Sequence, residues 1–303
     1  MNAQNTTKVV EYKSGREHTS PTGIGHSRPS LFSQLSLCYL TSALLFLGCD
    51  QRVTIHIADL SHPTSEVRRK AAYELVNEGH SAVDPLLVAI STGSDTLRYI
   101  GAQVLGRIGS PRSAPMLLSL SRDANTHVRK EAILALGKIH VVSLKDTLQD
   151  ILQHEAIAEL RASAAESLTG FRDTSVVSSL CLALEDSSTT VRQSAIAALN
   201  KIWAPSSAKS ILKAMRDPDE KVRFIATQIA GIRQIPAARL PLRKALEDPS
   251  PWVRAEAARG VAHLADTAAV DALVDLLKRY EGADADAAHK ALWELTGVDY
   301  IVE

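Results

Sequence analysis

Apolar and polar positions recur along the chain between residues 53 and 297, and the pattern repeats in units of nearly constant length. Most copies fit the pattern Val/Leu-Arg-x-x-Ala-Ala/Ile-x-x-Leu. Its arginines are Arg68, Arg98, Arg129, Arg161, Arg192, Arg223 and Arg254, with successive spacings of 30, 31, 32, 31, 31 and 31. Seven occurrences at such even spacing predict one structural unit that is repeated in series.

The apolar residues of each repeat fall on one face of a helix. Counted from the arginine, they occupy positions −1, +3 and +7, which is the period of an amphipathic helix. Position +3 is small in every copy, so a neighbouring helix can approach closely. A second, shorter apolar cluster precedes the arginine by eight to twelve residues, and Pro and Gly mark the junctions. Each repeat is therefore predicted to be a pair of helices, and stacked pairs would share one core.

An acidic residue stands six positions before the arginine in five repeats: Asp123, Glu155, Asp186, Asp217 and Asp248. In the turn between two helices, it can cap the second helix and favour its positive end. It can also reach the arginine of its own or of the next repeat. We interpret these residues as a ladder that fixes how repeats stack, formed with Arg129, Arg161, Arg192, Arg223 and Arg254. A plain N-cap without pairing is the alternative.

The spacing D-x-x-x-x-x-R-x-x-A-A-x-x-L-G resembles the short HEAT-like repeats first associated with phycobilisome lyases. The resemblance covers about residues 53–297. It implies an all-α fold, namely an α-solenoid of about eight two-helix repeats. The last repeat has Ala285 in place of arginine but keeps Ala288 and Leu292. Such a departure is typical of a capping repeat whose outer face meets water.

The N-terminal part, 1–48, differs from the rest of the chain. Residues 1–30 are polar, and we expect a disordered leader there; residues 31–48 form a short apolar segment that follows Arg28. This layout is typical of a signal peptide. The ending Phe46-Leu47-Gly48-Cys49 resembles the lipobox of bacterial lipoproteins, which implies lipid attachment at Cys49. The repeats, at 49–303, would then face outside the cytoplasm in the cell envelope. A transmembrane anchor is the alternative, although eighteen residues interrupted by Ser, Gln and Thr are a borderline length.

The net charge and the possible catalytic or metal-binding residues indicate which classes of function the sequence disfavours. The formal net charge is zero, and 30 basic residues stand against 32 acidic ones after residue 48, which argues against a nucleic-acid partner. His154-Glu155 is a lone His-Glu pair, and we explain it by a structural role rather than by metal binding. Cys181 falls where other repeats have leucine, so we expect its thiol to lie in the core. We predict no catalytic residue, no metal and no cofactor. The alternative is an enzyme or accessory subunit, bilin lyase-like or metal-dependent hydroxylase-like.

Positions +1, +5 and +9 of the second helix are predicted to project away from the core. In stacked helix pairs these helices usually line the concave face, which is the extended surface that binds partners. Arg and Tyr are enriched in interface hot spots. We therefore predict that another protein binds at Arg69, Tyr73, Tyr99, Arg107, Lys130 and Lys138. The function favoured is a non-catalytic protein–protein interaction scaffold, anchored outside the bacterial cytoplasmic membrane. An ordinary solvated helix face is the alternative for these six residues.

Overall fold

A computed structural model describes residues 51–300, which form helices joined by short turns, with no strand in this range. Residues 51–59 are helical and pair with α2, and seven further pairs follow. The prediction of an all-α solenoid with eight two-helix repeats is confirmed. The helices are α2 (Ser65–Glu78), α3 (Val83–Ser91), α4 (Asp95–Ile108), α5 (Ala114–Leu120), α6 (Thr126–Lys138), α7 (Leu144–His154), α8 (Ala158–Leu168), α9 (Val177–Ala183), α10 (Thr189–Lys201), α11 (Ala208–Ala214), α12 (Glu220–Ile232), α13 (Arg239–Ala245), α14 (Pro251–His263), α15 (Val270–Arg279) and α16 (Ala283–Thr296).

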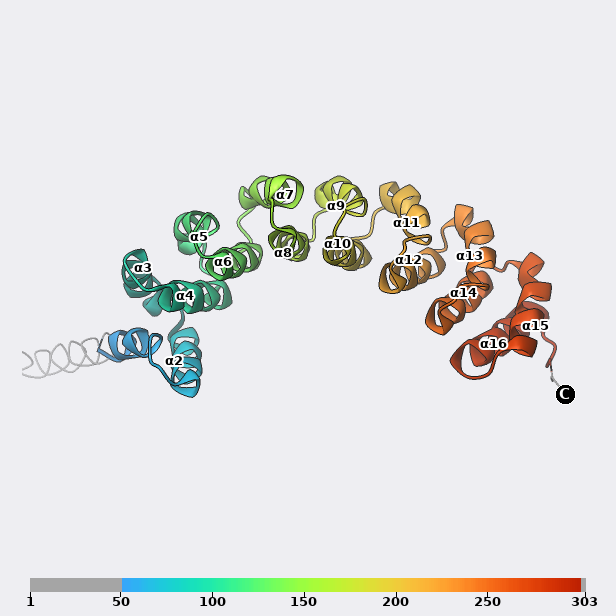
Figure 1. Ribbon diagram of the computed structural model, residues 1–303, viewed down its shortest axis with the longest axis horizontal. Coiled ribbons are helices and arrows are strands. Elements are labelled where there is room, and N and C mark those ends of the chain that lie inside the picture. Colours follow the sequence, from blue (N-terminus) through green and yellow to red (C-terminus); the bar gives the residue numbers. More distant parts are fainter. Residues whose placement is uncertain (1–50, 301–303) are drawn as a thin grey trace, which may run out of the picture. The chain divides into compact units, whose positions relative to one another are not determined.

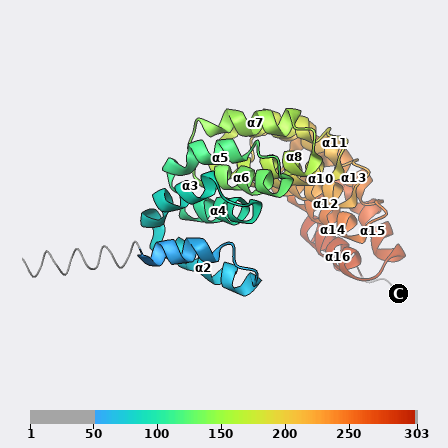
Figure 2. The ribbon, with the colours of Figure 1, turned by 60° about the vertical axis from the view of Figure 1, so that its left-hand side comes forward.

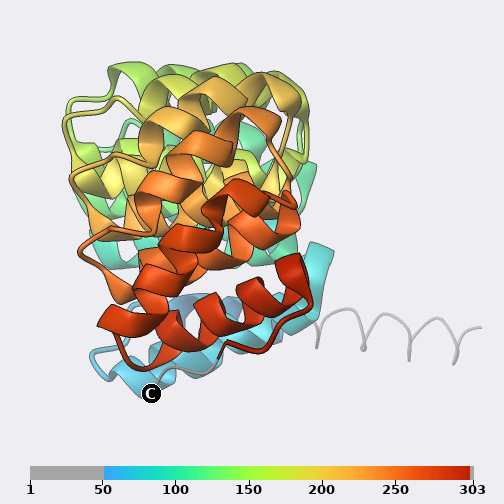
Figure 3. The ribbon, with the colours of Figure 1, turned by 90° about the vertical axis from the view of Figure 1, so that its right-hand side faces the viewer.

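The helices of residues 51–300 lie in two layers (Figures 1 and 2). The odd-numbered helices, α3 to α15, form the first-helix layer. The even-numbered helices, α2 to α16, form the second-helix layer. Each even-numbered helix packs against the next even-numbered one, and corresponding helices run in similar directions when the row is viewed from its end (Figure 3). The second-helix layer lies on the concave side of this row (Figure 1). Equivalent side chains of successive repeats are thereby brought into lines.

The core lies between the two layers and continues from one repeat to the next. In the second-helix layer it is built from position +7, where Leu75, Leu105 and Leu136 are fully buried. From α3 on, the first-helix layer contributes at least one fully buried side chain per repeat, at Leu86, Leu117, Leu148, Leu180, Ile211, Leu242 and Leu273. Full burial of such a side chain stabilises the fold by about 1.5–3 kcal/mol. Because two helices alone cannot cover these residues, the repeats depend on their neighbours.

Small residues allow the second helices to touch backbone to backbone. A Cβ atom added to Gly231 of α12 would lie 2.6 Å from the Cα of Gly260 in α14. One added to Gly137 of α6 would lie 2.6 Å from the carbonyl oxygen of Ser167 in α8. Real Cβ atoms do not come this close to backbone atoms, so glycine is required at both contacts.

In the repeats that carry the arginine, the N-cap of the second helix lies four residues before the arginine rather than six. Asn125 caps α6 by accepting a hydrogen bond from the backbone N–H of His127 at 2.9 Å, and Asp219 caps α12 by accepting from Val222 at 3.0 Å. The acidic residues at position −6 accept instead from the backbone N–H two residues further on, as Asp123 does from Asn125 at 2.8 Å. The N-cap alternative is therefore wrong for position −6, because that residue lies two positions before the N-cap.

The predictions for the leader 1–30, the apolar segment 31–48 and the lipid attachment at Cys49 fall outside the described residues. Among residues 51–300, no helix combines the length and the hydropathy needed to cross a membrane.

Candidate functional site

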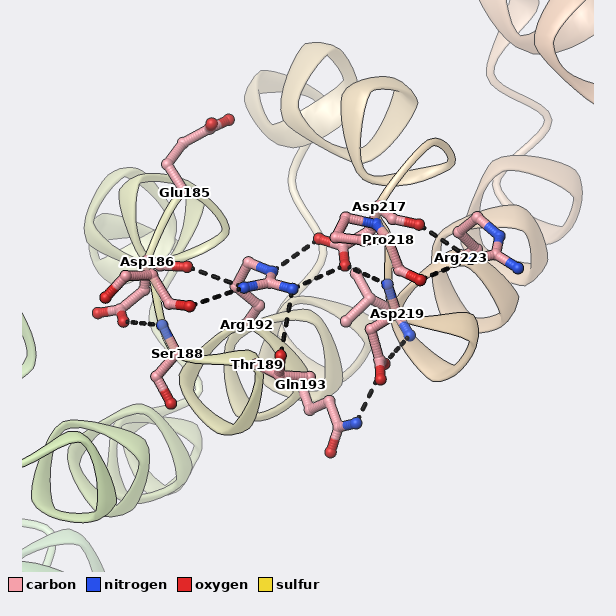
Figure 4. Close-up of polar contacts among 12 residues, drawn as sticks. Glu185, Asp186, Ser188, Thr189, Arg192, Gln193, Asp217, Pro218, Asp219 and Arg223 are labelled. Carbon is pink, nitrogen blue, oxygen red and sulfur yellow. Dashed lines mark hydrogen bonds and ion pairs between the residues drawn. The ribbon is translucent and has the colours of Figure 1, made fainter.

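Ladder arginines connect the turn of their own repeat to the turn of the next one (Figure 4). Arg192 donates through Nε and Nη2 to the two carboxylate oxygens of Asp217, at 2.8 and 3.0 Å. Its Nη1 donates to the backbone carbonyls of Asp186 and Ser187, at 3.0 and 3.3 Å. The planar guanidinium group can make both kinds of contact at once, since its donors form a rigid fork. One side chain thus fixes the spacing and the orientation of two successive turns.

The same geometry recurs in three other rungs. The Nε–carboxylate distances are 2.7 Å for Arg98–Asp123, 2.8 Å for Arg161–Asp186 and 2.7 Å for Arg223–Asp248. The hydrogen bond from Arg161 is the main reason that the pKa of Asp186 lies below its ordinary value. The carboxylate of Asp186 is therefore charged at neutral pH and holds the preceding repeat in register.

The ladder lacks a contact between Arg129 and Glu155. Arg129 donates to the carbonyls of Asp123 and Ala124 in its own turn, at 2.8 and 3.1 Å, whereas Glu155 accepts from the backbone N–H of Ile157 at 3.2 Å. Within the described part of the chain, no hydrogen bond or ion pair joins the two residues. The repeat between them is one residue longer than its neighbours. Glu155 therefore lies one residue further from the preceding arginine than the ladder aspartates do.

The last rung uses an aspartate that the repeat pattern does not identify. Arg254 donates through Nε to Asp284 at 2.7 Å, and the two side chains are only 7% and 2% exposed. The ring of Tyr280 lies 3.8 Å from the guanidinium carbon. Asp284 stands in the first turn of α16 rather than six residues before the arginine position, so an alignment of repeat columns misses it. An acidic residue at the start of a helix was the available signal.

The six residues predicted to bind a partner all lie in the second-helix layer. Four of them are exposed, and Tyr73 leaves 55% of its surface accessible; Tyr99 and Lys130 are half-buried. Lys130 donates to Glu159 of the next repeat at 2.6 Å, which raises the pKa of Lys130 and lowers that of Glu159. Its charge is therefore already balanced within the chain. The structure places these residues on three successive helices, as follows: Arg69 and Tyr73 on α2, Tyr99 and Arg107 on α4, Lys130 and Lys138 on α6.

The prediction that position +1 projects from the core is wrong for two repeats. Ala162 and Ala255 are 6% and 2% exposed. A methyl group is too short to emerge past the side chains of the neighbouring helices, whereas Arg69 and Lys130 extend beyond them. The surface offered to a partner is therefore made by the longer side chains.

Residues considered for chemistry lie apart from one another. His154 contacts Asp150 at 2.9 Å on the surface of α7, and Glu155 is bound to its own turn. No group of three His, Cys, Asp or Glu side chains that could hold a metal occurs within residues 51–300. Cys181 is half-buried rather than buried, and desolvation raises the pKa of its thiol.

Aligned helix pairs that share one core and a line of Arg–Asp contacts define an α-solenoid. The family model for HEAT repeats matches residues 55–136, 83–169, 146–228 and 208–293. The chain belongs to the HEAT repeat family, and the predicted resemblance to this family is confirmed. No curated protein sequence matches it.

Solved structures are similar to this chain at low sequence identity. YibA of Escherichia coli is 22% identical, with a TM-score of 0.58 over 77% of this chain and 86% of that one. The complex of CpcE and CpcF of phycocyanin lyase from Nostoc is 18% identical, with a TM-score of 0.42 over 80% and 94%. Human deoxyhypusine hydroxylase is 22% identical, with a TM-score of 0.38 over 84% and 100%. At these identities the likeness extends to the fold alone.

Proposed function

We propose that this protein is a non-catalytic scaffold that binds another protein on its second-helix layer. The observation that supports the proposal most directly is the alignment of long, exposed side chains on successive parallel helices. Arg69, Tyr73, Arg107 and Lys138 belong to three neighbouring helices and are all exposed. HEAT repeats generally mediate protein interaction through such extended surfaces.

The chemistry of these side chains suits recognition. Tyr presents a rigid ring and a hydroxyl group, and Arg presents five donors, so both contribute strongly to interface cores. At the start of α4, the ladder arginine Arg98 bonds Asp123 in the turn before α6 and holds these two helices in register. A partner would therefore meet a surface that is already ordered before it binds.

Site-specific photo-crosslinking in the native cell tests which layer contacts the partner. The photoreactive residue p-benzoylphenylalanine would replace Tyr73 or Gln103 in the second-helix layer. Val88 and Leu182, which are 72% and 64% exposed in the first-helix layer, provide matched control positions. We expect adducts of one defined mass from the first two positions and none of that mass from the controls. Adducts of the same mass from all four positions, or from the controls alone, would contradict the proposal.

Charge reversal gives a second test, and the structure identifies the better residue for it. Reversal of Lys130 would also place two carboxylates against each other at Glu159, so a loss of binding there has two explanations. Arg69 is exposed and has no ion pair among the described residues. Arg69→Glu should weaken the captured complex without changing the stability of the fold.

We also propose that the scaffold is held at the outer side of the cytoplasmic membrane through Cys49. The apolar segment 31–48 and the ending Phe46-Leu47-Gly48-Cys49 support this. Cys49→Ala should release the protein from the membrane fraction or block its processing, as measured by fractionation and intact mass. A variant that stays membrane-bound with unchanged mass would point to a transmembrane anchor instead.

A further inference from the structure

Five second helices in succession end in a cation at the same edge of the solenoid. This edge, where each second helix leads into the next repeat, is here called the basic edge. Four of these residues are in the last turn of a helix or directly follow it, and Arg172 caps the short 3-10 turn after α8. All five are exposed: Arg107 of α4, Lys138 of α6, Arg172 after α8, Lys201 of α10 and Arg233 after α12.

These cations have no carboxylate partner among residues 51–300. Arg233 contacts the Trp203 ring at 5.8 Å and the carbonyl of Asn200, and the side chains of the other four make no hydrogen bond or ion pair within this range. Two carboxylates at the starts of first helices are already paired: Asp173 with Lys145 at 2.8 Å, and Asp84 with Arg112 at 2.9 Å. Helix C-termini favour cations, but this effect is local to each helix and leaves the charges free to bind.

The opposite edge carries charges of both signs, which pair with one another: Asp95 with Arg98, and Glu159 with Lys130. The first turns of the second helices contain Asp95, Glu159 and Glu220, and the ladder aspartates lie beside them. Unpaired positive charge in the second-helix layer is therefore concentrated along the basic edge. A narrow acidic segment confined to this edge would meet cations that have no partner in residues 51–300.

The spacing of the cations selects the conformation of the partner. Packed helices lie about 8–10 Å apart. A chain in the extended or polyproline II conformation advances about 3.1–3.4 Å per residue, so every third residue falls opposite the next helix. Acidic side chains at every third position would each face one cation.

A depression of about 230 Å³ between α8 and α10 adjoins this line at Lys201. Thr169, Gln193 and Ser194 line it and can bond the backbone of an extended segment, which has unpaired donors and acceptors. Glu166 also lines it, one turn before the end of α8, and is the one unfavourable charge there. We propose that the basic edge binds an extended acidic protein segment with Asp or Glu at every third residue. This inference rests on the proposed scaffold function and specifies the partner's chemistry.

Fluorescence anisotropy with the full-length protein tests the proposal. The probe is a labelled 18-residue peptide with Glu at every third position and Pro and Ser between; the control peptide has Gln in place of Glu. The variant Arg107→Gln/Lys138→Gln/Arg172→Gln/Lys201→Gln is compared with Arg122→Gln/Lys209→Gln/Lys244→Gln/Lys278→Gln, which removes the same charge from exposed positions elsewhere. Because the replaced side chains of the first variant make no hydrogen bond or ion pair in the described part of the chain, circular dichroism should show an unchanged fold.

We expect the Glu peptide to bind and the Gln peptide to bind at least about tenfold more weakly, with a similar loss for the basic-edge variant and almost none for the control variant. Added salt should weaken binding steeply, since the screening length at 0.1 M is about 10 Å. Glu166→Gln should strengthen binding about twofold, because it removes a repelling charge.

Three outcomes would overturn the proposal. The first is equal binding by the basic-edge and control variants. The second is tighter binding of an 18-nucleotide single-stranded oligonucleotide than of the Glu peptide, which would indicate a nucleic-acid partner. The third is salt-sensitive self-association by sedimentation without peptide binding, which would indicate a second copy of the chain. If the crosslinked partner persists in the basic-edge variant, the scaffold function stands and only this inference fails.

Discussion

Breaking one rung of the ladder should reveal how much the contact between repeats stabilises the fold. In Arg192→Met, Asp217 loses both bonds from the guanidinium group while it stays 7% exposed in its turn. An unpaired buried charge costs about 3–5 kcal/mol. The side chain of Arg192 is 11% exposed, so some water reaches the site and we take the lower end, about 3 kcal/mol.

Arg129 provides a control at the equivalent repeat position. It donates to two carbonyls of its own turn and to the hydroxyl of Thr126, as Arg192 does to its own turn and to Thr189. It lacks only the carboxylate of the next repeat. Arg129→Met should therefore cost about 1 kcal/mol, the net value of ordinary hydrogen bonds. The difference between the two variants, about 2 kcal/mol, measures the contact between repeats.

Urea unfolding followed by circular dichroism at 222 nm gives both free energies. Repeat arrays can unfold in parts, so native-state hydrogen exchange should accompany it and locate the loss in α10 to α12. In Arg192→Met/Asp217→Leu, the unpaired charge is removed, and part of the stability should return. Equal losses in Arg192→Met and Arg129→Met would refute the view that the ladder ties the repeats together.

Two other predictions follow from the ladder and from the helix contacts. Because Arg161 lowers the pKa of folded Asp186, its ionised form stabilises the fold above the unfolded pKa of about 3.9, and this contribution is lost as pH falls through the folded value. Asp186→Asn should be less stable than wild type at pH 7, and the gap should narrow below about pH 4 in urea unfolding; a constant gap would contradict this. Gly231→Ala should destabilise the fold by about 1–3 kcal/mol in thermal unfolding, although alanine favours helices, since its Cβ meets the Gly260 backbone. Asn200→Ala, at the equivalent position of α10, should leave the free energy of unfolding within about 0.5 kcal/mol of wild type. If Gly231→Ala stabilised the fold instead, α12 and α14 would be able to move apart, and the reasoning would be wrong.

Most of the fold could be predicted from the sequence because the repeat imposes the same requirement seven times. Small residues at +3 and leucine at +7 recur, as at Ala132 and Leu136, and each recurrence confirms that the position is buried. A single helix pair gives a much weaker signal. The eight pairs and their order therefore follow from the period alone.

The details of the site depend on geometry that the period does not contain. The acidic residue at −6 was expected to cap its helix or to reach the arginine of its own or of the next repeat. Both expectations are wrong for Asp217, which bonds Arg192 of the preceding repeat. One added residue moves Glu155 out of reach of Arg129. Asp284, which lies outside the column of ladder aspartates, pairs with Arg254 instead. The basic edge was predicted only in part: Arg107 and Lys138 were expected to bind a partner, whereas Arg172 and Arg233 lie at other repeat positions than these two.

Each ladder arginine except Arg129 reaches forward to a carboxylate that belongs to the next repeat and is made later. During synthesis, a repeat therefore leaves the ribosome with its guanidinium group unpaired, and that group is satisfied only when the following repeat has emerged. Each newly made turn meets a waiting partner whose position is already set by the carbonyls behind it. Growth of the folded array should thus proceed from the N-terminus, and Asp284 in the closing helix completes the series, since it pairs with the last ladder arginine.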